Sequence, residues 1–318
     1  MQTEFVITAG EQPKRLDVFL VHREPKLSRA ALQRMITAGW VRVNDQIAKS
    51  SRRIKTGDVV AFDTPQAAPL RLDGQTRRLE ILFEDHGCLV LNKPAGIVVH
   101  PAPGHWSNTL LNALLDHCAR LGKPATPGLV HRLDKDTSGV MVIAKTAEAH
   151  RGLAAQFECH SITRQYEALV LRVPASRGGR IECAIGPDRQ NPKRTSMRTL
   201  QPKASVTEYQ VEEAFGMVAA RVLLRPHTGR THQIRTHLQA IGHPILGDRV
   251  YGGERAGAVD GYDIPRGMLH ARTLGFTHPI TRAYCEFAVA APSDFEVVCH
   301  VLRRAATQEG SERLQRES

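Results

Sequence analysis

The alternation of apolar and polar positions indicates two structured units along the chain. The first covers residues 13–63, where residues 15–21 have a short helical pattern and a second helix is expected to follow Ser28, a residue type that often caps helix N-termini. Residues 41–44 alternate like a strand, and residues 59–62 form a last short strand. The pattern therefore predicts a small α/β unit.

A larger unit follows a short connection. Pro65 and Pro69 discourage regular structure in residues 64–79, which we interpret as a linker. Residues 80–303 contain many short strand patterns with a few helical patterns between them. Strands are expected at 81–85, 88–93, 140–144, 166–173, 207–211 and 219–224, and helices at 147–159, after Ser107-Asn108, and between Arg230 and Gly242. This order is typical of an α+β domain with a mixed, mostly antiparallel sheet, and residues 304–318 are expected to form a polar tail that frays.

The charge of the chain indicates what kind of partner it binds. Hydrophobic residues make up 42% and charged residues 24%, which is typical of a soluble globular protein. The formal net charge is +11, so we expect a polyanionic partner such as nucleic acid. The charge is also clustered, because nine basic residues lie close together in the first unit. These nine are Arg23, Lys26, Arg29, Arg34, Arg42, Lys49, Arg52, Arg53 and Lys55. This clustering favours RNA binding over a solvated face without a ligand.

Other classes of protein are disfavoured by the composition. The six cysteines are scattered and form no CxxC pair, which argues against a zinc ribbon and against a disulfide framework. Residues 1–7 do not resemble a signal peptide, and no stretch approaches the roughly 20 apolar residues of a membrane span. We therefore expect a cytoplasmic protein without a membrane segment.

Candidate chemistry concentrates in residues 131–139, His-Arg-Leu-Asp-Lys-Asp-Thr-Ser-Gly, which lie between two apolar runs. Asp134 is placed at the rim of a buried sheet, where its carboxylate can meet a ligand while the protein shields its other side. Asp136 is a second candidate, but it directly precedes Thr-Ser-Gly and suits a turn better. Taken alone, Asp134 could equally belong to a structural salt bridge.

A second polar segment, residues 228–238, predicts a turn that leads into a helix. Arg230 precedes this helix, and Arg235 is expected in its second turn, off the apolar face. The two arginines can form a cationic wall over a carboxylate, which keeps the carboxylate ionised and oriented. Taken alone, the same pattern could be a helix start that binds phosphate.

These segments resemble the RNA pseudouridine synthases of the RluA type, and most closely the RluD-like branch that acts on large-subunit ribosomal RNA. The matching motifs, in the order of the family, are Asn-Lys-Pro-Ala-Gly to His-Pro at 92–101, His-Arg-Leu-Asp at 131–134, Arg-Gln-Tyr-Glu-Ala at 164–168 and Arg-Thr-His-Gln-Ile-Arg at 230–235. Residues 13–63 resemble the small RNA-binding domain of the fourth ribosomal small-subunit protein. The resemblance covers residues 13–302, and Thr236 is a small departure, because the family often has valine there.

The resemblance implies that Asp134 is the catalytic aspartate, that Arg235 pairs with it, and that Tyr166 faces the target base. Isomerising uridine breaks the bond from the sugar to the base nitrogen and remakes it to carbon. A carboxylate beside the sugar could attack it, stabilise its positive character or assist removal of a proton, and the sequence leaves these routes open. The uridine must leave its stack to reach the site. The reaction is redox-neutral and the chain has no nucleotide-binding or metal motif, so no cofactor is expected.

RNA contacts are expected from both units. Arg132 lies next to the catalytic carboxylate, and Lys93 either contacts a phosphate or belongs to a structural loop. The expected RNA-binding residues are Arg132, Arg230, Lys93, Lys193, Arg194, Arg29, Arg34, Arg52 and Arg53. The expected partner is ribosomal RNA or a pre-ribosomal particle, bound by a monomer.

Two other functions remain open at this point. One is a hydrolase that holds a metal with Asp134 and histidines. These histidines are His100, His131, His232 and His237. The last two are five residues apart, which suits a helical zinc pair less well than four. The other is a non-catalytic RNA-binding or ribosome-assembly protein, which would tolerate Asp134→Asn.

Overall fold

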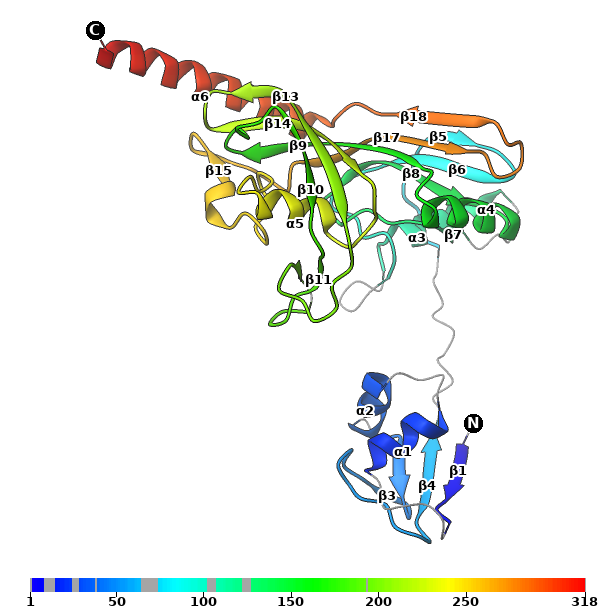
Figure 1. Cartoon of the computed structure of the whole chain (residues 1–318). Helices are drawn as coiled ribbons and strands as arrows, with labels where there is room; N and C mark the ends of the chain where they lie inside the picture. Colours follow the sequence, from blue (N-terminus) through cyan, green and yellow to red (C-terminus); the bar gives the residue numbers. More distant parts are fainter. Residues whose placement is uncertain are drawn as a thin grey trace. The chain divides into compact units, whose positions relative to one another are not determined.

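The computed structural model describes residues 2–8, 15–24, 29–37, 39–63, 74–101, 107–121, 127–192 and 194–317, without the side chains of residues 2, 29–31, 34, 63 and 309–317. It consists of two compact units, Met1–Arg71 and Leu72–Ser318, which are described separately (Figure 1). The division falls inside the predicted linker. None of the described helices is long and apolar enough to cross a membrane.

The first unit is a four-stranded antiparallel sheet with two helices. Its elements are β1 (Gln2–Val6), α1 (Leu16–Arg23), α2 (Arg29–Thr37), β2 (Val41–Val43), β3 (Gln46–Ile47) and β4 (Val59–Asp63), and the strand order is β1-β4-β2-β3. Leu16, Leu20 and Leu32 from the helices pack on Val43 and Val60 of the sheet to form one core. The predicted helices and strands are confirmed. Strand β1 was not predicted, and it belongs to the unit because it pairs with β4 along its whole length.

The second unit is built on a large mixed sheet. Its strands are β5 (Glu80–Glu84), β6 (Cys88–Lys93), β7 (Gly128–Leu129), β8 (Ser138–Ala144), β9 (Thr163–Leu171), β10 (Gly178–Glu182), β13 (Val206–Phe215), β14 (Ala219–Pro226), β17 (Leu269–Thr277) and β18 (Tyr284–Ala288). The order is β10-β13-β14-β9-β17-β8-β6-β5, with β18 beside β17 and β7 beside β8. In the described part of the chain only β8 and β17 pair in parallel, so the predicted α+β fold with a mostly antiparallel sheet is confirmed.

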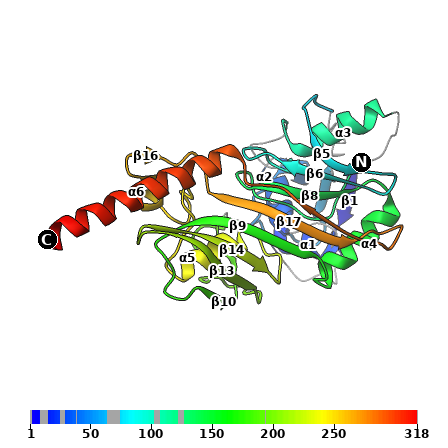
Figure 2. The same ribbon diagram turned by 90° about the horizontal axis from the view of Figure 1, so that it is seen from above.

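Short ribbons and helices complete the second unit. They are β11 (Gly186–Pro187) with β12 (Thr195–Ser196), β15 (Ala258–Val259) with β16 (Tyr262–Asp263), the 3-10 helix η1 (Glu254–Ala256), α3 (Leu110–Arg120), α4 (Ala147–Glu158), α5 (Gln233–Ala240) and α6 (Ser293–Glu317). Helix α4 packs on β7 and β8, and α5 packs on β14. Figure 2 shows α6 extending beyond the end of the sheet that contains β13 and β14.

Two predicted helix starts and the predicted C-terminal tail differ from the structure. Ser107-Asn108 was expected to open helix α3, but the helix begins at Leu110, because Thr109 is its N-cap and forms a reciprocal capping box with Asn112. Helix α5 begins only at Gln233, which places Arg235 in its first turn and not its second. Residues 304–318 were predicted to fray, but α6 continues to Glu317, since this stretch is rich in Ala, Glu, Gln, Arg and Leu, which favour helix.

Strand β17 brings the candidate residues together. Its residue Ala271 pairs with Gly139 of β8 on one side and with Tyr166 of β9 on the other. The approach to β8 is so close that a Cβ atom on Gly139 would lie 2.1 Å from the Ala271 carbonyl oxygen, and Gly139 has φ +117°. A glycine is therefore required where β8 begins. The loop that carries Asp134 enters the sheet at this point, and only strand β17 separates the start of β8 from Tyr166 on β9.

Candidate active site

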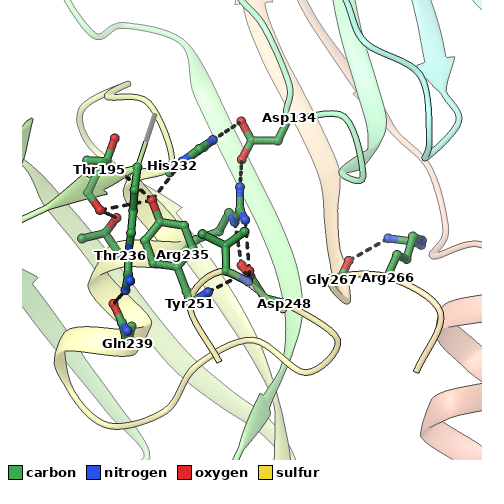
Figure 3. Close-up of polar contacts among 12 residues, drawn as sticks. Asp134, Thr195, His232, Arg235, Thr236, Gln239, Asp248, Tyr251, Arg266 and Gly267 are labelled. Atoms are coloured by element: carbon green, nitrogen blue, oxygen red, sulfur yellow. Dashed lines mark hydrogen bonds and ion pairs between the residues drawn. The ribbon is translucent and has the colours of Figure 1, made fainter. Parts of the chain in front are cut away.

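Asp134 lies in the loop that connects β7 to β8, and its carboxylate contacts an arginine from α5. Arg235 Nη1 donates to Asp134 Oδ2 at 3.1 Å, so the predicted pairing of these two residues is present (Figure 3). On its other side, Arg235 binds Asp248 with two hydrogen bonds, from Nε at 2.6 Å and from Nη2 at 3.0 Å. Burial alone would lower the pKa of Arg235, but the hydrogen bonds and charges of Asp248 and Asp134 raise it above its ordinary value. The arginine is thus a permanent cation held between two carboxylates.

Asp248 fixes the orientation of this arginine. Its side chain is only 3% exposed, and its Oδ1 also accepts hydrogen bonds from the backbone N–H groups of Val250 and Tyr251, both at 3.1 Å. Because Asp248 takes both Nε and Nη2, only Nη1 of Arg235 is directed at Asp134. The guanidinium carbon of Arg235 also lies 4.7 Å from the centre of the Tyr251 ring, a cation–π contact.

The loop after Asp134 is held by hydrogen bonds to three of its backbone carbonyl groups. Thr137 N–H donates to the Asp134 carbonyl at 3.2 Å, which closes a turn over residues 134–137. The turn predicted for Asp136 to Gly139 therefore comes earlier, because Ser138 and Gly139 already belong to β8. Gly96 N–H donates to the Lys135 carbonyl at 2.9 Å. Arg266 Nη1 donates to the Asp136 carbonyl at 3.0 Å, and the rest of its guanidinium is paired with Asp294. Loop, sheet and α6 therefore jointly determine the position of Asp134.

Lys93 also holds this loop, and the prediction that it contacts RNA is wrong. The side chain is completely buried, and Nζ donates to the carbonyls of Pro94 at 2.8 Å, Ile97 at 3.0 Å and Lys135 at 3.1 Å. Burial lowers the pKa of Lys93 to about 7, while the charges of Asp136 and Asp134 act in the opposite direction. Three acceptors match the three protons of an ammonium group, so the Lys93 side chain has a structural role beneath the site.

Tyr166 and Asp134 line the same hollow, whose volume is about 540 Å³. Burial raises the pKa of Tyr166, the positive charge of Arg164 lowers it, and the negative charge of Asp134 raises it further. The phenol is therefore protonated at neutral pH. A second hollow of about 570 Å³ adjoins the first and is bordered by Lys135 and Arg249. Asp134 lines both, and each is large enough for a nucleoside-sized group.

The predicted RNA-binding residues have different surroundings. Arg132 and Arg230 are exposed and line the Tyr166 hollow. Arg194 is half-buried, its guanidinium donates to Gln239 Oε1 at 3.0 Å, and it lies 4.8 Å from the ring centre of Tyr251. In the first unit, Arg53 is exposed and Arg52 is half-buried. Lys193 and the side chains of Arg29 and Arg34 lie outside the described residues.

The histidines of the metal-hydrolase alternative do not surround Asp134. His237 is fully buried, its Nε2 lies 2.9 Å from Ser205 Oγ, and burial lowers its pKa to about 4. His131 stacks on Phe157 at 4.6 Å and accepts a hydrogen bond from the backbone N–H of Val142. Only His232, with Nε2 3.8 Å from Asp134 Oδ1, is close to the carboxylate in the described part of the chain.

A separate cluster of possible metal ligands also fits a metal poorly. Asp85, Cys88 and His278 have their ligand atoms within 4.8 Å of one another. However, His278 Nδ1 accepts hydrogen bonds from two backbone N–H groups at 3.3 and 3.1 Å, which places the proton of the neutral ring on the Nε2 that faces Asp85. Burial also raises the pKa of the Cys88 thiol to about 12. The arrangement is therefore a structural link between two turns.

Comparison with known proteins identifies the family. Residues 87–240 match the model of the RNA pseudouridylate synthases, and residues 14–60 match the S4 domain. The ribosomal large subunit pseudouridine synthase D of Zymomonas mobilis is 41% identical to this chain over 301 residues, which are 91% of this chain and 93% of the relative. The chain belongs to the RNA pseudouridine synthases. The ribosomal large subunit pseudouridine synthase D of Pseudomonas aeruginosa is 39% identical over 95% of this chain and 98% of its own length.

The fold agrees with that of solved members of the family. The human RNA pseudouridylate synthase domain containing 4 superposes with a TM-score of 0.58 and 27% identity, and the match covers 70% of this chain and 93% of the human one. The chain is thus an RNA pseudouridine synthase with an S4 domain, as the sequence motifs predicted. Neither the hydrolase alternative nor the non-catalytic alternative has support among these relatives.

The sequence did not predict the roles of several residues of the site. Asp248, Tyr251 and Arg266 lie far from Asp134 in the sequence and reach it only through the folded sheet. Asp248 had one usable signal, because it directly follows the apolar run Ile245-Leu246-Gly247, much as Asp134 follows Gly128-Leu129-Val130. Tyr251 and Arg266 carried no comparable signal.

Proposed function

We propose that this enzyme isomerises uridines of large-subunit ribosomal RNA, with Asp134 as the catalytic residue. The observation that carries the proposal is the carboxylate itself, which is held on one oxygen by Arg235 and borders a hollow of nucleoside size. The substrate class is supported by the relatives from Zymomonas mobilis and Pseudomonas aeruginosa, which carry the large ribosomal subunit in their names and match along more than nine-tenths of both chains.

In this proposal, Oδ1 of Asp134 acts on the ribose of the flipped uridine. Oδ2 accepts from Arg235, whereas no hydrogen bond to Oδ1 is found among the described residues. An ionised oxygen beside the sugar can attack C1′, stabilise positive charge there or take a sugar proton. Each route lets the bond between N1 and C1′ break and the bond between C5 and C1′ form. The base then loses its C5 proton and gains one on N1, so the atoms balance without a cofactor.

Tyr166 and Arg235 would have distinct roles. Tyr166 lines the hollow next to Asp134, and its protonated phenol would stack on the target base or donate to it. Arg235 is assigned as the residue that keeps Asp134 ionised and aims it, because its remaining donors are taken by Asp248. Arg132 and Arg230, exposed at the same hollow, would contact the RNA around the extruded nucleotide.

The partner and its place in the cell follow from the same proposal. The basic S4 unit and the cationic rim would bind ribosomal RNA, either free or within a pre-ribosomal particle in the cytoplasm, and the enzyme would act as a monomer. Because much of this attraction comes from phosphates, binding is expected to weaken steeply with salt.

The substrate is tested by mapping pseudouridines in ribosomal RNA of cells that lack this enzyme. We expect one or more large-subunit sites to lose the modification and to regain it with the wild-type gene, but not with the Asp134→Asn gene. Small-subunit and transfer RNA sites serve as internal controls. Unchanged large-subunit RNA, with losses in transfer RNA instead, would refute the proposed substrate.

A further inference from the structure

His232 is a polar neighbour of Asp134 that the proposed mechanism does not use. It directly precedes α5 in the left-handed region, with φ 52°, and its ring makes no capping bond to that helix. Its Nε2 lies 3.8 Å from Asp134 Oδ1, and the two residues line both hollows (Figure 3). The unused carboxylate oxygen and this ring nitrogen therefore border the same space.

The hydrogen bonds of Tyr251 match the tautomer of His232 that carries its proton on Nδ1. The Tyr251 hydroxyl donates its single proton to the Thr195 carbonyl at 3.1 Å and accepts from the Thr195 N–H at 2.9 Å. His232 Nδ1 lies 2.9 Å from the same oxygen. When the hydroxyl donates its proton to the Thr195 carbonyl, it accepts from His232, and Nδ1–H is then the donor. Tyr251 is itself fixed, since it is buried and contacts the guanidinium groups of Arg194 and Arg235.

The remaining ring nitrogen is thus an acceptor. Burial lowers the pKa of His232, and the charge of Asp134, which raises it, does not reverse this shift. Among the other charged groups around the ring, Arg235 and Arg132 lower the pKa and Asp248 raises it. A neutral ring with its proton on Nδ1 has a lone pair on Nε2, and the described part of the chain supplies no donor to it. Two acceptors, Nε2 and Asp134 Oδ1, therefore face a space that a substrate donor can fill.

We propose that His232 Nε2 accepts a hydrogen bond from the 2′-hydroxyl of the target nucleotide, which makes His232 a specificity-determining residue for ribose. The inference rests on the proposed role of Asp134 beside the sugar. Within an RNA strand the target uridine has only two donors, the base N3–H and the 2′-hydroxyl, because its other sugar oxygens are esterified or in the ring. The 2′-hydroxyl is on the carbon next to C1′, where Asp134 acts, and N3 is farther away. A hydroxyl that reaches Nε2 also distinguishes RNA from DNA.

The test compares two substrates with two enzymes. The substrates are a target RNA and the same RNA with a single 2′-deoxyuridine at the target position. The enzymes are wild type and His232→Asn, chosen because asparagine tolerates the left-handed backbone and its shorter side chain does not reach the position of Nε2. We expect the deoxy substitution to lower kcat/KM about fivefold more in wild type than in His232→Asn, the factor for one neutral hydrogen bond of about 1 kcal/mol.

The comparison isolates the contact because the intrinsic reactivity of the deoxy sugar affects both enzymes equally. An equal deoxy penalty in both enzymes would overturn the inference, and it is the result expected if His232 were a cation that only holds Asp134. A 2′-deoxynucleotide placed one position 3′ of the target should give equal penalties and serves as the positional control. Should His232→Asn fail to fold, Tyr251→Phe takes its place, because it removes the acceptor that fixes the Nδ1 proton and should reduce the discrimination.

Failure of this inference can be separated from failure of the proposed function. Asp134→Asn is assayed on the same all-ribose RNA. If that variant is inactive and the deoxy penalty is equal in the two enzymes, the role of Asp134 stands and the role of His232 does not. If that variant is active, the premise about the sugar is lost.

Discussion

The buried carboxylate of Asp248 should be important for stability as well as for aiming Arg235. The change Asp248→Asn keeps the size of the side chain and an oxygen for the backbone N–H groups of Val250 and Tyr251. It removes the negative charge that accepts two hydrogen bonds from Arg235, which is 17% exposed where Asp248 is 3% exposed. Breaking a buried ion pair typically costs about 3–5 kcal/mol, and losing a hydrogen bond to a charged group costs about 1.5–3 kcal/mol.

The expected cost lies in the lower of these two ranges, because Arg235 is partly solvated and keeps Asp134 as a partner. We predict a loss of about 2–3 kcal/mol in the free energy of unfolding, which for a domain of this size lowers Tm by about 4–12 °C. Thermal unfolding of the full chain, followed by circular dichroism and calorimetry, measures this. The matched control is Asp263→Asn, because Asp263 is exposed on β16. A loss below about 0.5 kcal/mol, no larger than that of a typical surface change, would refute the reasoning.

Three further predictions concern other parts of the second unit. His237 is neutral in the folded state, with a pKa of about 4 against an ordinary 6.5, so its contribution to the free energy of unfolding is complete above pH 6.5 and is lost as the pH falls. Between a pH above 6.5 and pH 5, the wild type should lose about 2 kcal/mol more of this free energy than His237→Asn. Urea titrations of both proteins at the two pH values measure the difference. Lys93→Met removes the ammonium donor from the carbonyls of Pro94, Ile97 and Lys135, of which the last keeps the Gly96 N–H, and should cost about 2–4 kcal/mol by urea unfolding. Lys135→Met, which changes an exposed side chain, should cost less than about 0.5 kcal/mol. Arg132→Ala should reduce the slope of log binding constant against log salt by about 1 in filter-binding assays; an unchanged slope would exclude a phosphate contact by this residue.

The sequence was most informative where one local pattern determines one local structure. The apolar run before Ala144 predicts a buried strand, and β8 is buried at each of its seven positions. The polar segment before that strand places Asp134 in the loop that leads into it. The helical spacing of residues 233–240 keeps Arg235 off the apolar face of the helix. The pairing of Asp134 with Arg235, 101 residues apart, was accessible only through the resemblance of both motifs to one family.

The features that were missed depend on long-range packing. The sequence left Lys93 between a phosphate contact and a structural loop, because its burial depends on carbonyls of the Asp134 loop, which come together only after β6 and β8 pair. Asp248 and Tyr251 enter the site because the chain after α5 returns to it, and no periodic pattern encodes that path. The extent of α6 was missed because a polar composition was taken to indicate fraying, although its residues favour helix.

The central claim is that the Asp134 carboxylate carries the chemistry. The most direct measurement is the release of tritium from C5-labelled uridine in target RNA by purified Asp134→Asn, beside the matched variant Asp136→Asn, which alters an exposed carboxylate in the same loop. We predict that Asp134→Asn binds the RNA but releases no tritium, while Asp136→Asn remains active. Tritium release by Asp134→Asn at the rate of Asp136→Asn would contradict the account.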